Sequence, residues 1–132
     1  MSHERKCVSR KQCDRWARQW IDLFGLQQWR ISVVCEPVML LDGGEKRASS
    51  DVDHFNLQAR MRVATGQEPK DVCSSIGHEM LHLLCAELVD LGKAASLQLG
   101  ENAAKVLADQ IDAAEERLVV TLERALAKLD LN

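Results

Sequence analysis

Two histidines and a glutamate stand close together in the middle of the chain, in the sequence His78-Glu79-Met80-Leu81-His82. On an α-helix, residues four apart lie one turn apart on the same face, so both imidazoles can reach a single zinc ion about 2 Å from each nitrogen. Glu79 sits beside them and points toward the open side of such a metal. There its carboxylate can accept a proton from zinc-bound water and pass it to a leaving amine. The pattern H-E-x-x-H therefore indicates a catalytic zinc site.

A catalytic zinc usually has three protein ligands, so the motif needs one more. A histidine six residues after the second is excluded, because that position is Leu88, and the other histidines, His3 and His54, lie upstream. Asp90 is on the same helix but about 12 Å further along its axis. The third ligand is then expected to be a carboxylate from the next helix, as in His-His-Glu sites.

Helical periodicity selects this carboxylate between residues 111 and 129. At about 100° per residue, six apolar residues fall in one sector of the helix: Ile111, Leu118, Leu122, Ala125, Leu126 and Leu129. Glu115 lies inside this sector, and a carboxylate in an apolar stripe needs a cation. We therefore expect Glu115 to be the third ligand. Glu116, which points about 100° away, is the alternative.

Two other interpretations of the motif remain open. The histidines can be ordinary core residues, although burying two imidazoles and a carboxylate without partners would cost several kcal/mol. Alternatively, the metal is structural and a fourth protein ligand closes its shell. Cys85, three residues after His82, and Cys73, five residues before His78, are the candidates for that ligand.

The motif lies in a segment whose pattern is helical from residue 69 to residue 91, with Pro69 in the first turn and Gly92 expected to close the helix. Its apolar residues point in almost every direction, which is typical of a buried helix. They are Val72, Ile76, Met80, Leu81, Leu83, Leu84, Leu88 and Val89. Residues 94–131 are also expected to be helical, with a break near Leu99-Gly100.

Shorter elements precede this pair of helices. Apolar residues at helical spacing over 16–24 predict a first helix that ends near Gly25. Alternation over 29–35 predicts a strand, and the cleaner alternation over 55–63 predicts a strand with one buried face. Asp42-Gly43-Gly44 predicts a turn. This order of elements indicates an α+β fold with a short, mostly antiparallel sheet, a buried helix that carries the motif and a long C-terminal helix.

Composition limits the class of protein. The chain has 132 residues, 46% hydrophobic and 28% charged, which predicts one globular domain over 1–132. The net charge of −3 gives no general basis for binding nucleic acid, although residues 1–18 carry six basic side chains against two acidic ones. Residues 1–11 are expected to form a flexible basic N-terminus, without the apolar stretch of a secretory signal. No apolar run is long enough to span a membrane, and five cysteines without a C-x-x-C pair indicate free thiols in a reducing cytoplasm.

These features resemble those of the small zincin-type metallopeptidases encoded by phages and prophages, whose C-terminal half is a minimal gluzincin core. The resemblance extends over residues 12–130, and four segments carry it: 29–33, 59–63, 76–84 and 115–126. It implies a short antiparallel sheet over an active-site helix. It also implies a zinc ion held by His78, His82 and a downstream glutamate, with Glu79 as general base.

The resemblance also implies how a substrate binds. In zincins the strand before the active-site helix commonly pairs with an extended peptide, and residues 55–63 are expected to be that strand. The chain has no tyrosine, a usual donor to the oxyanion of the reaction, so His54, Arg60 or Arg62 is expected to replace it and to bind substrate. Gly77, just before the first histidine, stands where this family often has a bulkier residue.

Three functions follow from these observations. The first is a zinc-dependent peptidase in the cytoplasm of a bacterial host cell, with a protein or peptide as its substrate. The second is a zinc-stabilised binding or adaptor protein of phage origin, in which the site has weak or no catalytic activity. The third is association with DNA through residues 1–18, which contain no recognisable reading motif to support it.

Overall fold

The computed structural model describes residues 8–37, 39–41 and 44–128. Asp42 and Gly43 of the expected turn and most of the basic N-terminus lie outside these residues. The element order is helix, five strands and two helices, which confirms the α+β class. Internal contacts divide the chain into two compact units, Met1–Met80 and Leu81–Asn132, and the boundary falls within one long helix.

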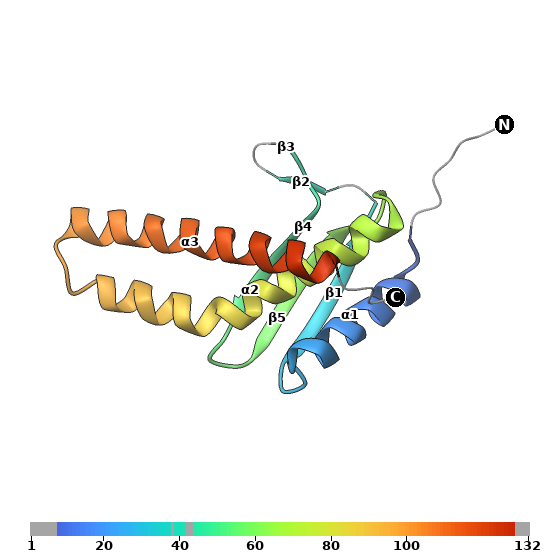
Figure 1. Cartoon of the computed structure of the whole chain (residues 1–132), viewed down its shortest axis with the longest axis horizontal. Coiled ribbons are helices and arrows are strands. Elements are labelled where there is room, and N and C mark those ends of the chain that lie inside the picture. Colours follow the sequence, from blue (N-terminus) through green and yellow to red (C-terminus); the bar gives the residue numbers. More distant parts are fainter. Residues whose placement is uncertain (1–7, 38, 42–43, 129–132) are drawn as a thin grey trace. The chain divides into compact units, whose positions relative to one another are not determined.

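Helix α1, Arg10–Phe24, begins and ends where its sequence provides caps (Figure 1). The Ser9 side chain accepts a hydrogen bond from the Gln12 backbone N–H, and Gly25 closes the helix in the left-handed conformation at φ 70°. A glycine adopts this conformation without a steric penalty from Cβ, so the end predicted at Gly25 is confirmed.

Three strands form the main sheet, in the order β1-β5-β4. Strand β1, Arg30–Glu36, pairs in parallel with β5, Gln58–Ala64, and β5 pairs antiparallel with β4, Ala48–Asp53. A separate antiparallel pair is formed by β2, Met39–Leu41, and β3, Gly44–Lys46. The sheet is therefore mixed rather than mostly antiparallel, because the chain makes β2, β3 and β4 before it returns to pair with β1.

Strand β5 has the buried face that its alternation predicts, but it starts later than expected. Ala59, Met61 and Val63 are buried, whereas Phe55 is 87% exposed. Residues 54–57 form a turn in which Asp53 accepts hydrogen bonds from Asn56 and Leu57 takes a positive φ of 52°. This aspartate-initiated turn competes with the extended conformation, so the strand begins at Gln58 instead of Phe55.

The position of β5 also corrects its expected role in substrate binding. It is the central strand, with β1 on one side and β4 on the other, so neither of its edges can take a peptide. Among the strands of this sheet, the outer ones are β1 and β4. The polar sequence of β4 carries no strong strand pattern, which is why the edge strand was missed.

Helix α2, Pro69–Ser96, is longer than its sequence predicts. Gly92 does not end it, because this glycine lies in the helix against the Ile111 side chain of α3, Glu101–Ala127. The helix ends instead at Ser96, whose hydroxyl donates to the Lys93 carbonyl. A glycine is needed where two helices approach closely as well as at a helix end, and Gly92 serves the first purpose.

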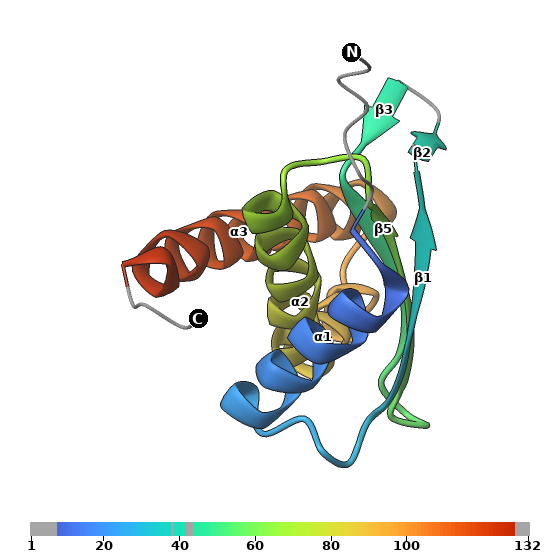
Figure 2. The ribbon, with the colours of Figure 1, turned by 90° about the vertical axis from the view of Figure 1, so that its right-hand side faces the viewer.

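The two halves of α2 differ in burial. In the first unit Val72, Ile76 and Met80 are fully buried, and Figure 2 shows this half of α2 on the same side of the sheet as α1. In the second unit Leu84, Leu88 and Leu91 are exposed. The expectation of a helix buried on all sides is therefore wrong beyond Leu83, since only α3 packs against the later turns within their own unit.

Helix α3 runs antiparallel to the second half of α2 after a break at residues 97–100, as predicted (Figure 1). Its fully buried apolar residue is Val119. Leu118 and Leu122, which helical periodicity predicts in the buried sector, are partly exposed. The buried face is thus rotated from the apolar stripe toward Glu115. In the part of the chain that the structure describes, no helix is both long enough and apolar enough to cross a membrane.

Candidate metal centre

The motif occupies the middle of α2, which is regular from Pro69 to Ser96. Proline at the first helical position and Asp71 in the first turn both favour a helix start here. Trp20 of α1 lies against Gly77, and its indole N–H donates to the Cys73 carbonyl at 2.9 Å. The absence of a side chain at residue 77 therefore allows a bulky aromatic ring to pack one residue before the motif.

His78, His82 and Glu116 form a group that can hold a metal ion. Each offers one ligand atom, and these atoms all lie within 4.8 Å of one another. The two histidines come from successive turns of α2 and the glutamate comes from α3. Two imidazoles and one carboxylate are a donor set that zinc uses in catalytic sites.

The ring of His82 lies between two carboxylates of α3. Its Nε2 is 3.3 Å from Oε2 of Glu116, and its Nδ1 is 3.2 Å from Oε1 of Glu115. Two ligand atoms bound to one tetrahedral zinc at about 2.0–2.2 Å are about 3.3–3.5 Å apart, so the Nε2–Oε2 distance fits a shared zinc. The ring can use only one nitrogen for that ion, which leaves the other facing Glu115.

Both candidate glutamates thus reach the site, in different positions. Glu116, the alternative of the sequence prediction, belongs to the group with both histidines, whereas Glu115, the first choice, contacts the far nitrogen of His82. The Glu115 side chain is well buried and that of Glu116 is half exposed. Burial in the apolar sector, which singled out Glu115, therefore identifies the glutamate next to Nδ1 of His82. It does not identify Glu116, the glutamate that groups with both histidines.

Neither candidate cysteine joins the group among the described residues. Burial raises the pKa of the Cys85 thiol, and the nearby Glu115 carboxylate raises it further. Burial likewise raises the pKa of the Cys73 thiol. In the metal-free protein both thiols therefore favour the protonated form.

Glu79 is buried, with 8% of its surface exposed, and its Oε2 accepts a hydrogen bond of 2.7 Å from the Ser50 hydroxyl. Ser50 lies on β4 opposite Met61 of β5, so it shares the face of the sheet that carries the core. Sequence reasoning missed Ser50, since this serine belongs to a polar segment without a strand pattern. The pairing of its segment with the buried strand β5 is what brings Ser50 to Glu79, and this pairing is visible only in the structure.

Arg60 and Arg62 do not reach Glu79. Side chains alternate along a strand, so both arginines lie on the face opposite to Met61 and to Ser50. Arg62 forms a bidentate ion pair with Glu36, which raises the pKa of its guanidinium. The expectation that Arg60 or Arg62 binds substrate or an oxyanion therefore stays a prediction, and the face on which both lie is opposite to that of Ser50.

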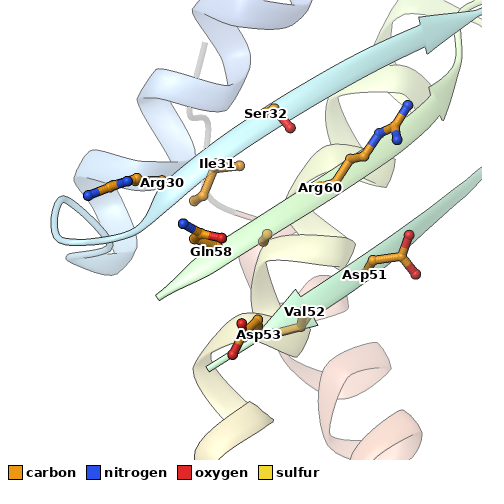
Figure 3. A pocket seen from close by; sticks show the side chains of 9 residues that line it. Arg30, Ile31, Ser32, Asp51, Val52, Asp53, Gln58 and Arg60 are labelled. Atoms are coloured by element: carbon orange, nitrogen blue, oxygen red, sulfur yellow. The ribbon is translucent and has the colours of Figure 1, made fainter. Parts of the chain in front are cut away.

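The outer face of the sheet contains a hollow of ≈ 580 Å³ to which Arg60 contributes (Figure 3). Ser32, Arg60 and Asp51 are cross-strand neighbours there. Arg30, Gln58 and Asp53 form the next row. His54 lies beyond this hollow in the turn after β4, with its ring 4.1 Å from that of Phe55. None of these residues belongs to the His-His-Glu group.

Comparison with known proteins adds no relative. No family model matches the chain, and neither the curated proteins nor the solved structures contain a significant match.

Proposed function

We propose that the protein is a zinc-dependent peptidase of the minimal zincin type, with His78, His82 and Glu116 as metal ligands and Glu79 as general base. The observation that carries the proposal is the His-His-Glu group formed on the helix that also holds the buried Glu79. The free thiols of Cys13, Cys35, Cys73 and Cys85 support a reducing cytoplasm, such as that of a bacterium carrying a phage.

The donor set favours zinc over harder cations. Magnesium and calcium prefer oxygen ligands, whereas imidazole nitrogens with one carboxylate suit zinc. When bound, zinc lowers the pKa of its water toward neutrality and polarises a carbonyl group. The absence of a fourth His, Cys, Asp or Glu from the group, among the described residues, favours a catalytic over a purely structural ion.

In this proposal Glu79 moves the proton of the reaction. Its Oε2 is occupied by the Ser50 hydroxyl, which leaves Oε1 to take a proton from the attacking water and to deliver it to the departing amine. The hydrogen bond also fixes the carboxylate in one orientation, because a charge-assisted bond at 2.7 Å is short and strong. Ser50 is therefore a positioning residue for Glu79.

Glu115 has a corresponding role toward His82. A metal-bound histidine commonly gives its other ring N–H to a carboxylate, which fixes the tautomer and the orientation of the ring. The 3.2 Å contact between Nδ1 of His82 and Glu115 provides such a partner. We accordingly propose Glu116 as the ligand and Glu115 as the residue that orients the ligand histidine.

The substrate in this proposal is an extended peptide that pairs with the outer edge of β4. Within the described sheet β4 pairs only with β5, and its Ser50 brings this strand to Glu79. Backbone pairing reads few side chains, so a broad sequence preference is expected. This replaces the central strand, residues 55–63, as the strand that takes the peptide.

The test combines metal content with hydrolysis of denatured, dye-labelled casein. The wild-type chain is expected to carry about one zinc and to cleave casein, and Glu79→Gln is expected to retain the zinc while cleavage falls by about 10²–10⁴-fold. Glu87→Gln, an exposed glutamate of the same helix, is the matched control and should keep both properties.

The same assay distinguishes the proposed roles of Glu115 and Glu116 of α3. Glu116→Gln should lower the affinity for zinc more than Glu115→Gln, for which a loss of about 10–100-fold is typical of an outer partner. Cleavage that survives Glu79→Gln, or a wild-type chain that binds no zinc, would remove the peptidase proposal.

A further inference from the structure

The second unit exposes a row of leucines along α2. Leu84, Leu88 and Leu91 are spaced four and three residues apart, which places them on one side of the helix. Their exposed fractions are 47%, 75% and 59%. Single exposed leucines are ordinary on a protein surface, but a contiguous row indicates a contact surface.

Helix α3 adds apolar side chains to this row. Leu118 and Leu122 are 49% and 37% exposed, although the pattern of the sequence is that of a buried face. Such partly covered leucines lie at the border of the surface that α3 buries against α2. In the second unit, both α2 and α3 therefore have apolar side chains that remain exposed to solvent.

The two rows lie on the same side of the helix pair. On α2 the leucines are about 120° around the axis from the side that contacts α3, where Lys93 binds Asp112. On α3, Leu118 and Leu122 are about 90° around from the side that contacts α2. On each helix the leucines are reached from the contact side by turning opposite to the direction in which residue numbers increase. Because the two helices are antiparallel, these turns have opposite senses in space and bring both rows to one common face of the pair. We call this face, formed by Leu84, Leu88, Leu91, Leu118 and Leu122, the leucine face.

We propose that the leucine face binds the same face of a second copy of the chain. A two-fold axis parallel to the helices would place each α2 over the partner's α3 and produce an antiparallel four-helix bundle. The charges beside the leucine face fit this arrangement. The outer flank on α2 carries Glu87 and that on α3 carries Arg117, so the axis brings opposite charges together.

The size of the leucine face sets the strength of the contact. The second-unit part of α2, residues 81–96, is about 24 Å long, and two adjacent helices are about 20 Å wide. This gives on the order of 480 Å² on each copy, or about 960 Å² in total, which is below the roughly 1,200 Å² of standard stable interfaces and in the range of weak, transient ones. The dimer is therefore a weak one, with a Kd in roughly the micromolar range.

Sedimentation equilibrium of the full chain over about 5–200 µM tests the proposal. The wild type should dimerise with concentration, and Leu88→Glu should raise the Kd at least about tenfold, because the contact would bury a charge. Val106→Glu is the matched control, since Val106 is also exposed on α3 but lies outside the leucine face. Circular dichroism shows that each variant remains folded, which is expected because both residues face solvent in one copy.

Charge reversal identifies the occupant more closely. Glu87→Arg should weaken the dimer by about two- to fivefold, and the double variant Glu87→Arg with Arg117→Glu should recover the wild-type Kd. A wild type that remains monomeric at the highest concentration would overturn the proposal. A dimer that Leu88→Glu leaves intact, or that Val106→Glu weakens equally, would also overturn it.

Discussion

The two compact units of this chain are built on different amounts of buried apolar surface. In the first unit, α1, three strands and the start of α2 surround fully buried residues such as Met61, Val63, Val72 and Ile76. In the second unit two helices pack side by side and Val119 is the fully buried residue of α3. The first unit has a core of its own, whereas the second is a helix pair with one narrow buried strip.

The residues of the candidate site are divided between these two units. Glu79 belongs to the well-packed unit, where a strand holds its carboxylate through Ser50. His82, Glu115 and Glu116 belong to the helix pair. Regions with few buried contacts open most readily, and ligands shift their stability by mass action. We therefore expect Glu79, the proposed general base, to be rigid without metal and the proposed ligands on the helix pair to become rigid only when metal is bound.

The largest expected effect is on the core of the first unit. Met61→Ala should lower the free energy of unfolding by about 2–5 kcal/mol, because it removes a buried side chain and leaves a cavity. Val119→Ala, at an equally buried position of α3, should cost about 1.5–2 kcal/mol for the smaller loss. Denaturant unfolding measures both. Equal costs would mean that the helix pair is as tightly packed as the sheet.

Zinc should stabilise the helix pair more than the sheet. At a free concentration about 100-fold above the Kd, it should add about 2.7 kcal/mol to the free energy of unfolding. Hydrogen exchange should show the added protection on α3, around Glu115 and Glu116. A chelator should reverse it, and His82→Ala should abolish it. Zinc-dependent protection confined to the sheet would contradict both the ligand assignment and the contrast between the units.

Alkaline pH should act on the first unit. Burial raises the pKa of the Cys13 thiol to about 12, with smaller contributions from the Cys35 thiol and the Asp14 charge. The unfolded chain loses this proton near 9.0, the folded chain only near about 12. Between these values the folded state binds more protons, so the stability present below pH 9 falls steadily as the pH rises toward the folded-state pKa.

Cys13→Ala supplies the control for this pH dependence. It should lower stability at neutral pH by a small amount, since it removes one buried sulfur, but it should flatten the decline above pH 9. Unfolding in urea at several alkaline pH values distinguishes the two effects. An unchanged slope in Cys13→Ala would assign the decline to other groups.

Local signals predicted those parts of the fold that depend on a few neighbouring residues. Gly25 ends α1 because its backbone needs a positive φ, and alternation located β1 and the buried part of β5. The motif itself located the helix and two of the three residues of the group that can hold a metal ion. These features follow from spacing along the chain, which a sequence displays directly.

Features that depend on contacts between distant segments were not predicted. Strand β4 is polar and becomes a strand through its pairing with β5, so neither it nor Ser50 had a local pattern. The choice between Glu115 and Glu116 depends on the rotation of α3 against His82, which the apolar stripe gives only to within one residue. Gly92 has the sequence of a helix end but the position of a helix–helix contact.

The smallest effects come from the two glycines of α2, one in each unit. A Cβ at Gly77 would stand 2.7 Å from the Trp20 ring, which is packed and cannot withdraw, so Gly77→Ala should cost about 1–2 kcal/mol despite the helical preference of alanine. A Cβ at Gly92 would meet only the flexible end of Ile111 at 3.1 Å. Gly92→Ala should therefore be neutral or stabilise by up to about 1 kcal/mol. Thermal unfolding compares the two variants, and a Gly92→Ala penalty as large as that of Gly77→Ala would show that the helix pair tolerates overpacking no better than the core beside the motif.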